Sequence, residues 1–130
     1  MASLERSKGR RSRSRFAQIP RDVLVSHALA SADHAAFRVL VALAAGYNGH
    51  NNGALALTRE QARQFGILSH DTLGRGLSAL ESRGLIVRTC PGSRRPPTPS
   101  RFALTWRPTD DTEWTRAART PSREFASWAP

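Results

Sequence analysis

The residues of this sequence with the clearest binding chemistry are its arginines, which gather in two places. The first group lies near the N-terminus, between serines and glycines, and comprises Arg6, Lys8, Arg10, Arg11, Arg13 and Arg15. The second group lies in a proline-rich segment and comprises Arg94, Arg95 and Arg101. A guanidinium can bind a phosphate through two parallel N–H bonds, and the whole chain carries a formal charge of +10. Two such groups in so basic a chain predict a nucleic-acid partner; the alternative is simple solubilising charge.

A third set of polar side chains lies on a predicted helix over residues 70–83, whose opposite face carries regularly spaced leucines. The outward set comprises Ser69, His70, Thr72, Arg75, Ser78 and Ser82. Arg75 is the best candidate to read a base, because its fork of N–H groups matches guanine O6 and N7. The alternative for Arg75 is an ion pair with Asp71, one turn earlier in the helix.

Two glycines, Gly74 and Gly76, interrupt this same helix. Each of them costs about 1 kcal/mol of helix stability relative to alanine. Two explanations stay open. Either the glycines let another backbone approach closely, or the helix becomes fully ordered only when it binds its partner.

Residues for catalysis or metal binding do not form a recognisable set. The four histidines are dispersed without metal-ligand spacing, and Cys90 is the single cysteine. We therefore expect a protein that is not an enzyme and that uses no metal and no cofactor. No apolar run approaches the roughly 18 residues of a membrane span, and no signal sequence is evident. These patterns favour a cytoplasmic protein with no membrane contact.

Apolar spacing and capping residues predict the elements of the first half of the chain. Pro20 is expected to open a short helix. Ser31 is expected to cap a central core helix with Asp33 in its first turn. That helix ends in the Asn/Gly-rich segment 48–53. We expect the asparagines there to support a turn; contact with phosphates or with a partner is the alternative.

The second half of the chain is predicted to contain a strand at 54–57, helices at 58–65 and 70–83, and antiparallel strands at 85–89 and 102–106. Thr58 and Gln61 have the spacing of a capping box. Gly66 and Gly84 are expected to end the two helices in left-handed conformations. The prolines between the two strands predict a projecting loop, residues 91–99, that does not pair as a ladder.

Two short helices joined at a glycine turn and followed by a hairpin predict a winged helix-turn-helix, a mainly α fold with a small β-hairpin wing. We expect a disordered basic arm at 1–15, a folded domain at 16–107 and a tail at 108–130 with a short helix capped by Asp111. Three aromatic residues of the tail either pack back on the domain or anchor a protein partner: Trp114, Phe125 and Trp128.

Several motifs resemble those of bacterial winged helix-turn-helix proteins: the loop 47–53 (YNGHNNG), the helix start at 69–75 (SHDTLGR), the segment 80–86 (LESRGLI) and the strand 104–106 (LTW). The ending of LESRGLI is similar to that of MarR-like regulators. The loop and the strand are similar to small phage and plasmid proteins related to replication initiators. The resemblance covers 16–114, and the proline-rich wing and the basic arm depart from the usual pattern.

The resemblance implies DNA binding, in which the second helix reads bases through its first residues and the wing contacts the backbone. The residues that match this reading helix are Ser69, His70, Thr72 and Arg75. We expect a sequence-specific, nucleoid-associated binder of double-stranded DNA from a mobile element, acting in transcriptional control or replication initiation. An adaptor or inhibitor that uses the winged helix and the aromatic tail is the first alternative, and RNA binding is the second. A homodimer formed through the first helix or the tail is a further hypothesis.

Overall fold

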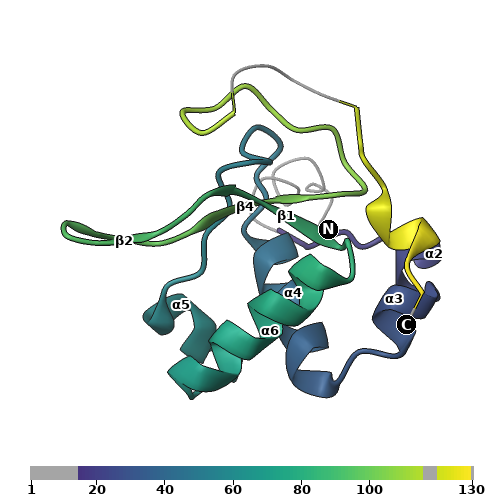
Figure 1. The fold of residues 1–130 in the computed structure, drawn as a ribbon, viewed down its shortest axis with the longest axis horizontal. Helices are drawn as coiled ribbons and strands as arrows, with labels where there is room; N and C mark the ends of the chain where they lie inside the picture. The colour runs from purple at the N-terminus through teal and green to yellow at the C-terminus, as the bar shows by residue number, and fades with distance from the viewer. Residues whose placement is uncertain (1–14, 116–119, 130) are drawn as a thin grey trace, which may run out of the picture.

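The computed structural model describes residues 15–115 and 120–129 (Figure 1). Within these ranges the elements are α2 (Arg21–Leu24), α3 (His27–Ala30), α4 (His34–Ala45), α5 (Arg59–Gln64), α6 (His70–Ser82), β1 (Ile86–Cys90), β2 (Ser93–Arg94), β3 (Pro97–Thr98), β4 (Arg101–Leu104) and the 3-10 helix η1 (Glu124–Ser127). This mixture of helices and a small antiparallel hairpin is compatible with the expected winged helix. None of the helices in the described ranges is long and apolar enough to cross a membrane.

The N-cap of the central helix α4 lies two residues later than predicted. Asp33 is the N-cap, and its Oδ1 accepts a hydrogen bond from Ala36 N at 2.8 Å. Ser31 instead ends α3, where its hydroxyl donates to His27 O at 2.7 Å. The prediction of Ser31 as the cap is therefore wrong. The carboxylate of Asp33 also interacts favourably with the positive end of the helix dipole, which a hydroxyl does only weakly.

α6 packs against α4 through a glycine. A Cβ built on Gly76 would lie 2.7 Å from Val39 Cγ2 and 3.6 Å from Ala36 Cα, both in α4. Only a residue without a side chain lets the two helices approach so closely, which answers the question that the sequence left open for Gly76. Gly74 is different, because a Cβ there would meet no atom within 4 Å.

The two predicted helices form as α5 and α6, but each is slightly shorter than expected. Thr58 and Phe65 are the caps of α5, and α6 ends at Ser82 with Arg83 as its C-cap. The side chain of Thr58 accepts from Gln61 N, and the side chain of Gln61 accepts from Thr58 N, so the capping box forms. Gly66 and Gly84 have φ of +81° and +76°. Both values lie in the left-handed region, where a side chain is strained.

The hairpin contains two antiparallel ladders in succession. β1 pairs with β4, with Ile86 opposite Leu104, as the sequence predicts. Beyond an irregularity at Cys90, β2 pairs with β3, with Arg94 opposite Pro97. The prediction that residues 91–99 stay unpaired is therefore wrong. Proline cannot donate to a ladder, but a hairpin strand open on one side needs only some of its N–H groups. We call residues 91–100 the distal hairpin (Figure 1).

The predicted strand at 54–57 forms only an isolated bridge, between Leu55 and Phe102 of β4. Leu55 N donates a hydrogen bond to Phe102 O at 3.1 Å, and Leu55 O accepts one from Phe102 N at 2.7 Å. The segment before it, the Asn/Gly loop, is held by its own side chains. Asn48 N donates to Asn51 Oδ1, and Asn51 Nδ2 donates to Gly46 O. These local bonds confirm the turn-forming role expected for the asparagines.

Asn52 joins this loop to the end of the hairpin. Its side chain is fully buried, and its Oδ1 accepts from Leu104 N at 2.7 Å. Its Nδ2 donates to the carbonyl oxygens of Leu104, Arg107 and Pro108 at 2.9 to 3.3 Å. The amide thus satisfies backbone groups at the end of β4 and in the residues that follow it.

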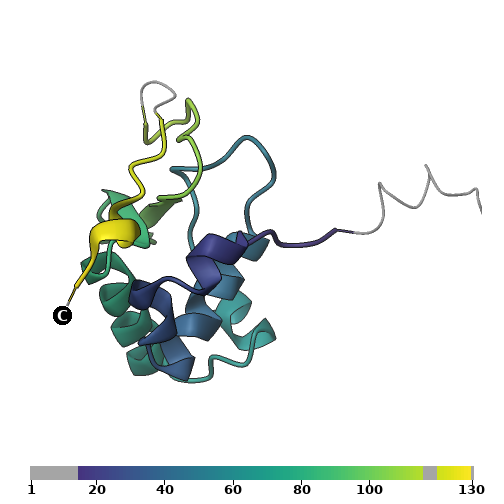
Figure 2. The same cartoon turned by 90° about the vertical axis from the view of Figure 1, so that its right-hand side faces the viewer.

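The C-terminal segment packs on the domain. Phe125 in η1 is 3% exposed and belongs to the main core. Trp128 is half-buried, with its ring 5.3 Å from the ring of His27 and under the guanidinium of Arg83. Figure 2 shows η1 beside the N-terminal helices. Of the two alternatives left open for the aromatic residues of the tail, packing on the domain is the one observed for Phe125, which is therefore not available to anchor a partner.

The short helix expected after Asp111 does not begin in the described residues. Residues 111–115 form no helix, and the Thr112 hydroxyl accepts from Trp114 N and Thr115 N. The hydroxyl satisfies N–H groups locally and so offers the backbone an alternative to a helical turn. Ala117 and Ala118, which the expected helix would include, lie outside the described residues.

Gly76 and Gly74 give a matched test of the helix contact. Gly76→Ala forces a methyl group against Val39, so we expect a loss of about 1–3 kcal/mol in the free energy of unfolding. Gly74→Ala meets no neighbour and improves helix propensity, so a gain of about 1 kcal/mol is expected. Urea denaturation of both variants measures the difference, and equal effects would contradict the assigned contact.

Asn52→Ala tests the buried amide. It removes two buried bonds to the backbone of Leu104 and the part-buried bonds to the carbonyls of Arg107 and Pro108, so the free energy of unfolding should fall by about 3 kcal/mol. Asn51→Ala is the control, because it removes bonds within an exposed turn and should cost about 1 kcal/mol. Thermal and urea unfolding measure both values. A smaller loss for Asn52→Ala than for Asn51→Ala would contradict the role of Asn52.

Candidate nucleic-acid interface

α5, the first turn of α6 and the distal hairpin lie on one side of the molecule (Figure 1). α2, α3 and η1 lie on the opposite side. Arg59, Arg63, Ser69 and His70 line one small hollow between α5 and α6, so the two arginines stand beside the start of α6. A helix N-terminus presents free N–H groups and the positive end of the dipole, which add to the positive potential of these arginines.

Most described arginines elsewhere on the molecule form side-chain hydrogen bonds with other protein groups. The arginines bonded in this way are Arg38, Arg83, Arg88, Arg101, Arg107 and Arg123. Arg83, for example, donates to Ala28 O at 2.8 Å and covers the ring of Trp128 at 4.5 Å. Arg107 donates to Gln18 Oε1 and covers the ring of Tyr47. Much of the positive charge counted in the sequence therefore stabilises the fold.

Arg101 is one of these occupied arginines. The sequence grouped it with Arg94 and Arg95 as a backbone contact of the wing. It begins β4 at the base of the hairpin, where its Nη1 donates to Ala54 O at 3.1 Å and its guanidinium lies 5.2 Å from the centre of the Trp114 ring. This geometry gives Arg101 a structural role, and it leaves Arg94 and Arg95 as the phosphate-binding candidates of the segment.

Four exposed arginines on the side of α5 and the distal hairpin have side chains without a partner in the described ranges: Arg59, Arg63, Arg94 and Arg95. Arg94 and Arg95 occupy the outer part of the distal hairpin. Arg59 and Arg63 were not among the residues predicted from the sequence. Their spacing of four residues, with buried Ala62 between them, places both on the outward face of α5 and could have revealed them.

Of the residues predicted at the reading face of α6, one caps the helix, one is half-buried and the others are exposed. Ser69 is the N-cap and its hydroxyl accepts from Thr72 N, while Thr72 itself is half-buried. His70, Arg75 and Ser78 are exposed. Arg75 pairs with Asp71, with Nε and Oδ2 3.4 Å apart, so the alternative considered for it from the sequence is the observed geometry. Arg10, Arg11 and Arg13 of the basic arm lie outside the described residues, and Arg15 is exposed.

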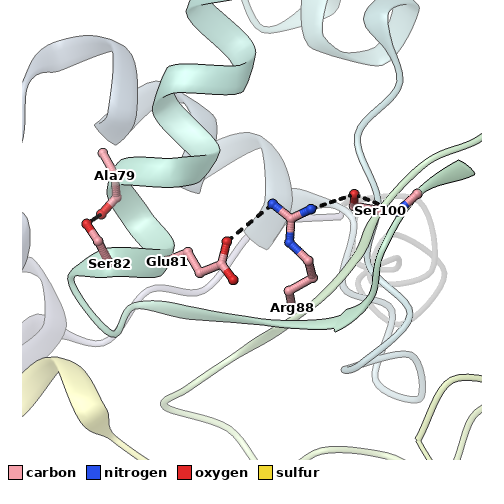
Figure 3. Close-up of polar contacts among 6 residues, drawn as sticks. Ala79, Glu81, Ser82, Arg88 and Ser100 are labelled. Carbon is pink, nitrogen blue, oxygen red and sulfur yellow. Dashed lines mark hydrogen bonds and ion pairs between the residues drawn. The ribbon is translucent and has the colours of Figure 1, made fainter.

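Arg88 fixes the hairpin against α6 (Figure 3). Its Nη2 lies 3.3 Å from Glu81 Oε1 in the last turn of α6, and its Nη1 donates to Ser100 Oγ at 3.1 Å. Ser100 Oγ also accepts from Gly92 N at 3.0 Å, which closes the base of the distal hairpin. One guanidinium thereby connects α6 to the segment that carries Arg94 and Arg95.

Comparisons with known proteins give no relative: no protein-family model, no curated protein and no solved structure matches this chain. The resemblance to winged helix-turn-helix proteins thus rests on the motifs of the sequence. The candidate site is defined by the positions and partners of this chain's own residues.

Proposed function

We propose that this protein is a winged helix-turn-helix that binds double-stranded DNA, with α6 in the major groove. In this proposal α5 braces α6, and β1 with β4 and the distal hairpin form the wing. The observation that carries it is the distribution of free arginines: the side chains of Arg59, Arg63, Arg94 and Arg95 have no partner within the described residues, whereas most other described arginines are bonded to protein groups. Guanidinium groups without internal partners are available for phosphates.

The dimensions of α6 agree with this proposal. Its thirteen residues give a length of about 20 Å, and a helix with side chains is about 10–12 Å across, close to the width of the major groove. The exposed face carries Gly74, Ser78 and Ser82, whose small size permits close approach to base edges. Arg59 and Arg63 then stand where phosphates flank the groove, and the distal hairpin reaches the neighbouring backbone.

The biological role in this proposal is that of a mobile-element protein, either a transcriptional regulator or a replication-initiator-like protein. It rests on the resemblance of the sequence motifs. The basic arm at 1–15 adds sequence-independent attraction to the same polyanion. An adaptor that docks through its aromatic tail is less favoured, because Phe125 is in the core and Trp128 is covered by Arg83.

Salt dependence of binding tests this proposal. If about six arginines contact phosphates, the logarithm of the affinity for duplex DNA should fall against the logarithm of the salt concentration with a slope of about −5. Arg63→Ala should reduce that slope by about 0.9. Arg21→Ala is the matched control, because Arg21 is also exposed but lies in α2, on the opposite side (Figure 1). Fluorescence anisotropy on a labelled duplex measures all three slopes.

Two results would contradict the proposal. A slope near zero for the unaltered protein would exclude phosphate contacts, and equal slopes for Arg63→Ala and Arg21→Ala would exclude the assigned face. Competition with duplex RNA of matched sequence belongs in the same experiment. Preferential displacement by RNA would favour the RNA-binding alternative.

A further inference from the structure

The exposed face of α6 has a carboxylate in the first turn of the helix. Leu73, Gly76 and Leu80 are buried, and the residues three and four apart on the opposite side are all exposed: Asp71, Gly74, Arg75, Ser78 and Ser82. Asp71 and Arg75 are the charged residues of this stripe, with side chains 80% and 75% exposed. The face that would meet DNA therefore presents a negatively charged carboxylate as well as a positively charged guanidinium.

An aspartate in this position opposes most DNA contacts. Phosphates repel it, and docking removes its water, which is unfavourable unless a donor replaces that water. Within the protein, Asp71 in the first turn of α6 stabilises the positive end of the helix dipole. At a DNA-binding face the same charge would also penalise sequences that offer it no hydrogen-bond donor.

The geometry of the ion pair suggests what each partner reads. Asp71 Oδ2 faces Nε of Arg75 at 3.4 Å, and the terminal Nη groups of Arg75 have no partner in the described part of the chain. Two N–H groups in a fork match guanine O6 and N7, and a carboxylate accepts from the N4 amino group of cytosine. A spacing of four residues is about 6 Å along a helix, against about 3.4 Å per base pair. The two side chains therefore reach base pairs within two steps of each other.

We propose that Asp71 is a specificity-determining residue, which with Arg75 reads a guanine and a cytosine amino group in close succession and penalises other sequences. This inference rests on the proposed DNA binding. Asp71 orients Arg75 through Nε, leaves its terminal N–H groups for guanine, and takes its own compensating hydrogen bond only where an amino donor lies opposite.

The experiment selects duplexes from a random pool with the unaltered full chain, and then compares the affinities of variants for the selected and for a random duplex at one salt concentration. Asp71→Asn keeps the shape and removes the charge. It should bind the random duplex severalfold more tightly and the selected duplex less tightly, so that the ratio of the two affinities falls about tenfold. Asp111→Asn, an exposed acid outside α6, is the control and should leave that ratio unchanged.

A second selection with each variant locates the effect. Asp71→Asn should lose preference at the cytosine position and Arg75→Ala at the guanine position. If Asp71→Asn raised the affinity for both duplexes equally, Asp71 would act only as a general repulsive charge and the inference would be overturned. An equal loss of affinity for both duplexes would overturn it as well. Circular dichroism of Asp71→Asn should match that of the unaltered chain. If the unaltered chain binds no duplex at all, the proposed function itself fails, and this result is distinct from the other two.

Discussion

The contact between α4 and α6 at Gly76 is the constraint on which the rest of the structure depends. A missing side chain lets Val39 of α4 enter the surface of α6, which fixes both the separation of the helices and the rotation of α6 about its axis. Because the buried side is fixed at this point, the opposite side must be the stripe from Asp71 to Ser82. The identity of the candidate reading face therefore follows from a packing requirement.

A second group of interactions positions the hairpin relative to that helix. Arg88 connects the last turn of α6 to Ser100, and buried Asn52 bonds the end of β4 to the loop that follows α4. The bonds of Arg88 are exposed to solvent, whereas those of Asn52 to Leu104 satisfy buried backbone groups. They leave Arg94 and Arg95 on a segment whose base is held at two points while its tip stays exposed.

The sequence predicted those features that depend on near neighbours. The capping box of Thr58 and Gln61, the left-handed Gly66 and Gly84 and the β1–β4 pair were all visible, because a few adjacent residues determine them. Features set by distant partners were not visible. Nothing near Arg101 in the chain indicates its bond to Ala54, and nothing near Phe125 indicates its place in the core. Within the candidate site, α6 was predicted and the spacing of Arg59 and Arg63 was a usable local signal, but their position beside the start of α6 required the packing of α5 on α6 to be known.

The arginines bonded within the fold must be separated from the free ones before the net charge can be related to the proposed DNA binding. A net charge of +10 suggests general attraction to a polyanion, yet arginines such as Arg83 and Arg107 are held by carbonyls and aromatic rings and contribute little to a docking face. Four free arginines lie on α5 and the distal hairpin, and the first two turns of α6 carry the ion pair of Asp71 and Arg75. In the proposed complex, attraction and discrimination would therefore come from different places. The free arginines would attract a duplex without regard to sequence, and the energy of the Asp71–Arg75 pair would depend on the base edges that it meets.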